Sequence, residues 1–152
     1  MDNHPSPRAN RDILIVGYGN TLRGDDGVGV RVAEAVEKLN LPGIRTLTCQ
    51  QLSPEHADPV SRAHTVIFVD AAVDSPKEVL LRKLEPGASS QLMAHAADPR
   101  TLLALARDVF GHAPDAWWLT IPATKLDFSE DLTPEAQRGF AQAVKTICAL
   151  CR

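Results

Sequence analysis

The hydrophobic positions of the chain fall into short continuous runs that alternate with stretches of helical spacing. Two runs, RDILIVGY at 11–18 and TVIFV at 65–69, are the clearest predicted strands because they are continuous, apolar and rich in β-branched residues. Further strands are expected at 44–49, 79–84 and 117–121. Runs without polar alternation are typical of strands that are covered on both faces, so a largely parallel sheet is expected.

Apolar residues spaced three and four apart predict helices between these strands. We expect helices at 28–39, from 54 to about 62, at 100–110, and from 134 to near the chain end. The pairs Asp98-Pro99 and Thr133-Pro134 indicate two helix starts, each with a capping side chain followed by proline. The face of the 100–110 helix that we expect to be buried comprises Leu102, Leu105, Ala106 and Val109. The corresponding stripe of the last helix comprises Phe140, Val144, Ile147, Cys148 and Cys151.

Alternation of strands and helices predicts an α/β fold with a mostly parallel central sheet and helices on both faces. A chain of 152 residues fits one domain, which we place at 12–152 after a flexible polar tail at 1–11. Two long segments, 85–97 and 123–132, are predicted loops. Loops of this length in a compact domain are often functional.

Charge and composition exclude several classes of partner. The formal net charge is −3, without a broad basic field, so neither nucleic acid nor an anionic membrane is expected as a partner. The apolar runs are too short to span a bilayer, and the first twelve residues lack the apolar segment of a secretory signal. Three cysteines do not form a disulfide framework, which fits a reducing compartment. We therefore expect a cytoplasmic protein, with a monomer as the default.

Four polar residues gather where a parallel sheet places its ligands, at the carboxyl ends of the strands. Asp25 and Asp26 follow the first strand, Asp70 follows the 65–69 strand, and His95 lies in the loop before the 100–110 helix. Two carboxylates and an imidazole suit nickel or zinc, whereas a carboxylate pair also suits general acid–base chemistry. Each residue also has a structural explanation, such as helix capping by an aspartate. The residues alone leave these alternatives open.

Other chemistries are poorly supported. A dinucleotide-binding turn would need a third glycine after Gly17 and Gly19, but Leu22 occupies that position, and two aspartates follow where a pyrophosphate would sit. The chain has no phosphate-binding G-x-x-x-x-G-K-S/T segment and no G-x-S-x-G turn. Cys148 and Cys151 lie near a helix end rather than at a helix start, so we interpret them as core or helix-end cysteines.

Four segments resemble a known family. The run ILIVGYGNTLRGDDGVGVRVAEAV at 13–36 is similar to the N-terminal motif of the nickel–iron hydrogenase maturation proteases, approximately G-x-G-N-x-L-x-x-D-D/E-x-x-G. The matching positions are Gly17, Gly19, Asn20, Leu22, Asp25, Asp26 and Gly29. The segments VIFVDAA and HAADPRTLLALARDVFG follow in the family's order, and FSEDLTPEA near the end is also similar. The resemblance covers roughly residues 12–150.

The resemblance implies a three-layer α/β/α sandwich and an endopeptidase that removes the C-terminal peptide of a hydrogenase large-subunit precursor after nickel insertion. By motif position, the residues that contact nickel would be Asp26, Asp70 and His95. The nickel would arrive with the precursor rather than as a permanent cofactor. The first of these positions is glutamate in some relatives. Gln50 stands where relatives with a similar Q-L-x-P-E segment often carry histidine.

Two questions stay open at this point. Peptide cleavage would proceed either through a metal-polarised carbonyl or water, or through Asp25 or Asp70 acting as a base on water. The alternative to a protease is a non-proteolytic nickel-binding, chaperone-like module that grips the precursor with the same residues. A nucleotide-binding α/β domain is a more distant third interpretation.

Overall fold

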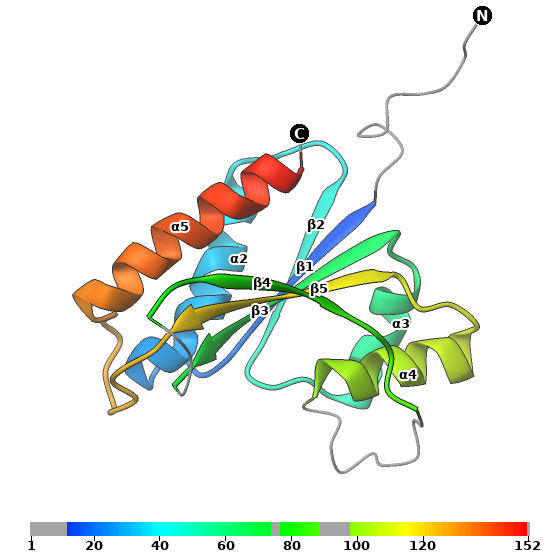
Figure 1. Ribbon diagram of the computed structural model, residues 1–152, viewed down its shortest axis with the longest axis horizontal. Helices are drawn as coiled ribbons and strands as arrows, with labels where there is room; N and C mark the ends of the chain where they lie inside the picture. The colour runs from blue at the N-terminus through cyan, green and yellow to red at the C-terminus, as the bar shows by residue number, and fades with distance from the viewer. Residues whose placement is uncertain (1–11, 74–76, 89–97, 152) are drawn as a thin grey trace, which may run out of the picture.

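The computed structural model describes residues 12–73, 77–88 and 98–151. They form one five-stranded sheet in the order β2-β1-β3-β5-β4 (Figure 1). The strands are β1 Ile13–Tyr18, β2 Ile44–Cys49, β3 Thr65–Ala72, β4 Leu80–Leu84 and β5 Asp115–Pro122. All neighbouring pairs are parallel except β4 and β5, which are antiparallel. The predicted, mostly parallel sheet is confirmed.

Helices cover both faces of this sheet, which makes the predicted three-layer α/β/α sandwich (Figure 1). The helices are α2 Val28–Lys38, α3 Ala57–Ser61, α4 Pro99–Phe110 and α5 Pro134–Leu150, and the 3-10 helices are η1 Gly24–Gly27 and η2 Pro54–His56. α2 and α5 lie on one face, and α3 and α4 lie on the other. Within the described ranges, no helix has the length and apolar character that a membrane-spanning segment needs.

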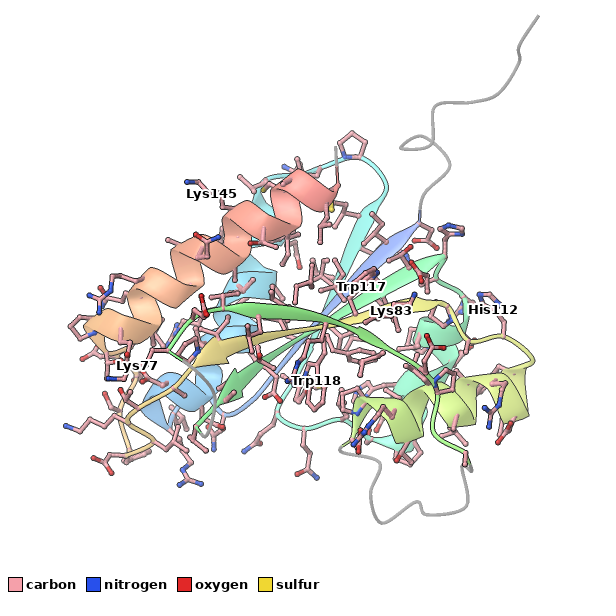
Figure 2. The ribbon with its side chains drawn as sticks, in the orientation of Figure 1. Lys77, Lys83, His112, Trp117, Trp118 and Lys145 are labelled. Atoms are coloured by element: carbon pink, nitrogen blue, oxygen red, sulfur yellow. The ribbon has the colours of Figure 1, made fainter. Side chains whose placement is uncertain are left out.

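The core is divided by the sheet into two apolar layers, because alternate residues of each strand point to opposite faces. Leu14, Val16 and Phe68 pack under α3 and α4, whereas Ile15 and Ile67 pack under α2 and α5. Every residue of β1 is buried, as expected for a strand in the interior of the sheet. The two tryptophans of β5 follow the same alternation. Trp118 packs against the α3–α4 layer and Trp117 against the α2–α5 layer (Figure 2).

Two predicted helix faces need correction. In α4, Val109 is 62% exposed and Leu103 is fully buried, so the buried face is rotated from the predicted one. In α5, the buried ridge consists of Ala136, Gly139, Ala143 and Ile147. The predicted Phe140 and Val144 are only partly buried at its margin, and Cys148 is half-buried. The small residues allow close packing: a Cβ on Gly139 would lie 2.6 Å from Ile121 Cγ2.

The strand order creates a switch point between β1 and β3. The chain goes from β1 to β2 on one side, then returns to β3 on the other, so the loops that leave β1 and β3 separate at this point. Open α/β sheets bind ligands at such positions. α2 packs directly on this region, because a Cβ on Gly29 would lie 2.3 Å from the carbonyl oxygen of Val69. The loop at 19–27 is therefore held at the switch point.

Candidate functional site at the switch point

Asp26 is oriented by the tight turn that leaves β1. Gly19 has a φ of +138°, and a Cβ there would lie 2.0 Å from the Asp26 carbonyl oxygen, so a side chain at this position would be strained and would clash. The Asn20 backbone N–H donates to Asp26 Oδ2 at 2.8 Å. The Leu22 backbone N–H donates in turn to Asn20 Oδ1 at 2.9 Å. The half-buried Asp26 carboxylate is thus fixed by a turn whose residues belong to the first motif.

Asp70 lies within β3, not after it, because this strand continues to Ala72. The Tyr18 hydroxyl of the neighbouring strand donates to Asp70 Oδ2 at 3.1 Å. Trp118 lies on the same face of the sheet. Its indole N–H makes no hydrogen bond of good geometry, but it points enough positive charge at Asp70 to help lower the pKa of that carboxyl. A buried tyrosine and a half-buried tryptophan therefore surround this carboxylate.

The pKa of Asp70 is raised to about 6. Burial is the main cause, and it outweighs the hydrogen bonds from the Tyr18 hydroxyl and the Ala71 backbone, which lower the pKa. The negative charge of Asp26 raises it further. The charge of Asp26 therefore acts on the carboxylate of Asp70. A cation beside both carboxylates would relieve their repulsion, so this pair fits a metal ion.

Asp25, next to Asp26, has a different environment. Its side chain is fully buried and accepts five hydrogen bonds from Thr124, Lys125 and Thr133. Burial would raise its pKa, but the bonds from Thr133, Thr124 and Lys125 lower the pKa below its ordinary value. Neither Asp25 nor Asp26 caps α2 through its side chain. Asp25 instead joins the loop at 19–27 to the loop between β5 and α5.

A hollow of about 310 Å³ lies beside this site, at the ends of β1 and β2. Its lining includes Asn20, Leu22, Cys49 and the exposed Gln50. Burial and the charge of Glu55 raise the pKa of Cys49 to about 11, so its thiol is protonated at neutral pH and is a poor nucleophile. The position of Gln50 gives it access to anything bound in this hollow.

His95, the third predicted ligand, lies outside the described residues and stays a prediction. Among residues 12–73, 77–88 and 98–151, no group of three His, Cys, Asp or Glu side chains is arranged to hold a metal ion. The sequence did not identify Tyr18 or Thr133 as site partners. Tyr18 had a signal, since it is the last residue of the first predicted strand and shares an alternating face with Leu14 and Val16. Thr133 was recognised only as a helix cap.

Comparisons with known proteins agree on one architecture. The structure is similar to the hydrogenase maturating endopeptidase HybD from Escherichia coli, with a TM-score of 0.75 and 23% identity over 91% of this chain and 90% of that chain. It is also similar to the nickel–iron hydrogenase maturation protease HycI from Thermococcus kodakarensis, with a TM-score of 0.71 and 20% identity over 94% of each chain.

The sequence match to a curated protein is local. Over 32 residues the chain is 62% identical to a protein of Methanocaldococcus jannaschii that is provisionally named a hydrogenase maturation protease. The matching segment spans 21% of this chain and 21% of that protein. No protein-family model matches the chain. The chain has the fold of the hydrogenase maturation endopeptidases, and the resemblance drawn from its motifs is confirmed at that level.

Proposed function

We propose that this chain is an endopeptidase that removes the C-terminal peptide of a nickel-loaded hydrogenase large-subunit precursor. The observation that supports this most is the position of two coupled carboxylates, Asp26 and Asp70, at the switch point of a fold found in hydrogenase maturation endopeptidases. Both belong to the sequence motifs that resemble that family. His95 is the proposed third contact to the nickel of the substrate.

The bound nickel serves as the recognition element in this proposal. Asp26 and Asp70 add oxygen ligands to a metal ion that the precursor already holds, so only the loaded precursor gains this binding energy. Each carboxylate is oriented in advance, Asp26 by the Asn20 N–H and Asp70 by the Tyr18 hydroxyl. Fixed carboxylates lose little freedom on binding, which favours a specific response to the metal.

Asp25 is assigned a structural role in this proposal, in place of the catalytic role considered from the sequence. Its carboxylate is fully buried and is held by five donors, so it has no face for a water molecule or a peptide. Asp70 is the remaining aspartate that was considered as a base. Polarisation of the scissile carbonyl by the substrate's metal is the other route to cleavage.

A protein substrate also fits the exposed apolar side chains of the neighbouring loops. Leu22 is 49% exposed and Phe128 is 82% exposed. Their loops are bridged, since the Ser129 N–H donates to the Leu22 carbonyl at 2.9 Å and the Gly24 N–H donates to the Ser129 carbonyl at 2.7 Å. Aromatic residues on fixed backbone are typical of protein–protein contacts.

The test is a time course of intact mass on purified, nickel-loaded precursor. Wild-type protein should shorten the precursor, whereas Asp26→Asn, Asp70→Asn and His95→Ala should each slow shortening by at least about tenfold. Glu34→Gln, which neutralises an exposed carboxylate on α2, is the matched control and should act as wild type. Binding of the precursor without any shortening would contradict the protease proposal and support a chaperone-like module. Normal cleavage by His95→Ala would remove the three-ligand model.

A further inference from the structure

One buried carboxylate joins two long loops at the carboxyl edge of the sheet. Asp25 Oδ1 accepts from the Thr133 N–H at 2.8 Å. Asp25 Oδ2 accepts from the Thr124 N–H at 2.9 Å and from the Lys125 N–H at 3.2 Å. These three donors belong to the segment between β5 and α5, about a hundred residues further along the chain. The contact is therefore tertiary and closes the edge of the fold.

Hydroxyl groups complete the same cluster. The Thr133 hydroxyl donates to Asp25 Oδ2 at 2.8 Å, and its oxygen accepts from the Ala136 N–H at 3.2 Å as the cap of α5. The Thr124 hydroxyl lies 3.3 Å from the same carboxylate oxygen. The first turn of α5, the end of β5 and the loop at 19–27 therefore share one charged acceptor.

The main chain of Asp25 is fixed from the same side. Its N–H donates to the Lys125 carbonyl at 2.9 Å. The preceding Gly24 has a φ of +57°, and a Cβ there would lie 2.7 Å from that same Lys125 carbonyl, so the two loops are in backbone contact. Asp25 is therefore hydrogen-bonded to the segment at 123–133 through both its side chain and its main chain.

We propose that Asp25 is a positioning residue that holds the adjacent Asp26 at the site by fastening its loop to the segment at 123–133. The two aspartates are consecutive, so a shift of the Asp25 backbone would move the Asp26 carboxylate and the Asn20 N–H that orients it. The effect on cleavage rests on the proposed function. The contact between the loop at 19–27 and the segment at 123–133 does not depend on any activity.

The carboxylate charge is necessary for this role. All the groups that contact the Asp25 carboxylate donate hydrogen bonds to it, and a carboxylate accepts on both oxygens. The amide of Asp25→Asn keeps one acceptor oxygen and turns two hydrogens towards other donors. An isosteric change therefore breaks the contact without altering the size of the side chain.

Amide hydrogen exchange tests the contact between Asp25 and the segment at 123–133 without any measurement of activity. In Asp25→Asn, the amides of Thr124, Lys125 and Thr133 should exchange more than about tenfold faster, while amides of β1 and β3 stay protected. Glu34→Gln should leave all of these rates unchanged. Unchanged exchange at the three loop amides, or an equal increase across the sheet, would overturn the proposal.

Cleavage of nickel-loaded precursor tests the positioning role. At a temperature where each variant is folded by circular dichroism, Asp25→Asn should lower kcat by more than about tenfold. Val36→Ala, which removes buried side-chain volume at the far end of α2, serves as a destabilised control and should keep wild-type kcat. An equal loss in Val36→Ala would show that stability alone is responsible and would contradict the role.

Thr133 variants keep the proposal testable if Asp25→Asn does not fold. Thr133→Val should lower kcat because it removes the hydroxyl donor, and Thr133→Ser should restore it. In the Asp25→Asn background, where that protein folds, Thr133→Val should add little, since both changes break one interaction. Fully additive losses would contradict the coupling. Failure of the wild-type protein to cleave would refute the proposed function. The hydrogen-exchange rates would still show whether Asp25 holds the loop at 19–27 to the segment at 123–133.

Discussion

Two aspartates at the same edge of the sheet have pKa values that are shifted in opposite directions, although burial raises the pKa of both. Asp25 is fully buried, yet the pKa of its carboxyl lies below the ordinary value. Asp70 is only partly buried, yet its pKa is raised to about 6. The difference comes from their surroundings: Asp25 is enclosed by donors from Thr124, Lys125 and Thr133, whereas Asp70 has fewer donors and the negative charge of Asp26 nearby.

Burial alone therefore does not decide the role of a carboxylate. A carboxylate with several donors is satisfied in its charged form and stabilises the fold. A carboxylate with few donors and a like charge beside it is costly when ionised, which is the condition that a bound cation relieves. We therefore separate a structural aspartate, Asp25, from the pair Asp26 and Asp70 that forms the candidate site.

The largest effect on stability is expected from Asp25→Asn. Because the change leaves buried donors unpaired, it should lower the free energy of unfolding at pH 7 by about 3 kcal/mol. The loss should shrink in acid, since the stability that Asp25 contributes is present above the ordinary aspartate pKa and disappears as pH falls through its lowered pKa. Urea unfolding at several pH values measures both effects. For Glu34→Gln we expect a loss below about 0.5 kcal/mol. A loss that small in Asp25→Asn would contradict the structural role that separates Asp25 from Asp26 and Asp70.

The opposite sign is expected for Asp70→Asn. The pKa of Asp70 rises from 3.8 to about 6 on folding, so its contribution to stability is present below pH 3.8 and is lost as pH rises through 6. The amide is uncharged and keeps an acceptor for the Tyr18 hydroxyl. The change that Asp70→Asn makes in the free energy of unfolding should therefore be about 2 kcal/mol more favourable at pH 7 than at pH 4. Destabilisation that is larger at pH 7 than at pH 4 would argue against this account.

A smaller effect is expected from Tyr18→Phe. Removing the hydroxyl deletes the donor to Asp70 Oδ2 and should cost about 1 kcal/mol at neutral pH. Since that hydrogen bond lowers the pKa of Asp70, the variant should move this pKa above about 6. Carbon NMR of the Asp70 carboxyl across a pH series reports the shift directly. A pKa that falls, or does not move, would exclude Tyr18 as the donor.

The smallest effect is expected from Thr124→Val. Its hydroxyl lies 3.3 Å from Asp25 Oδ2, at the long end of a hydrogen bond, while its backbone N–H at 2.9 Å is retained. The variant should lose about 0.5 kcal/mol. Thr133→Val should lose more, because the Thr133 hydroxyl lies 2.8 Å from the same oxygen and also caps α5. Thermal unfolding of the two variants side by side tests this ranking. A larger loss in Thr124→Val would reverse the assignment of the main donor.

Much of the fold was predictable because its strands and helix caps have strong local signals. The runs at 13–18 and 65–69 are continuous and apolar, and proline follows a capping residue at Asp98 and Thr133. The faces of α4 and α5 were less predictable. Periodicity alone could not show that α5 approaches the sheet through Ala143 and Gly139, because this choice depends on packing against Ile121.

The candidate site was predictable in part. Topology brings the ends of β1 and β3 together, so Asp26 and Asp70 could be placed at one edge from the order of elements. The different role of Asp25 could not be seen, because its donors lie about a hundred residues away in a predicted loop. The place of His95 in the site and the role of nickel stay predictions. The cytoplasmic location and the monomeric state also stay predictions.

The most direct test of the account compares one precursor in two states. Purified hydrogenase large-subunit precursor, with and without inserted nickel, is incubated with the wild-type protein and analysed by intact mass. We predict loss of a C-terminal peptide from the nickel-loaded form, with the nickel-free form left at full length. Equal shortening of both forms would contradict recognition through the metal, and no shortening of the loaded form would contradict the protease itself.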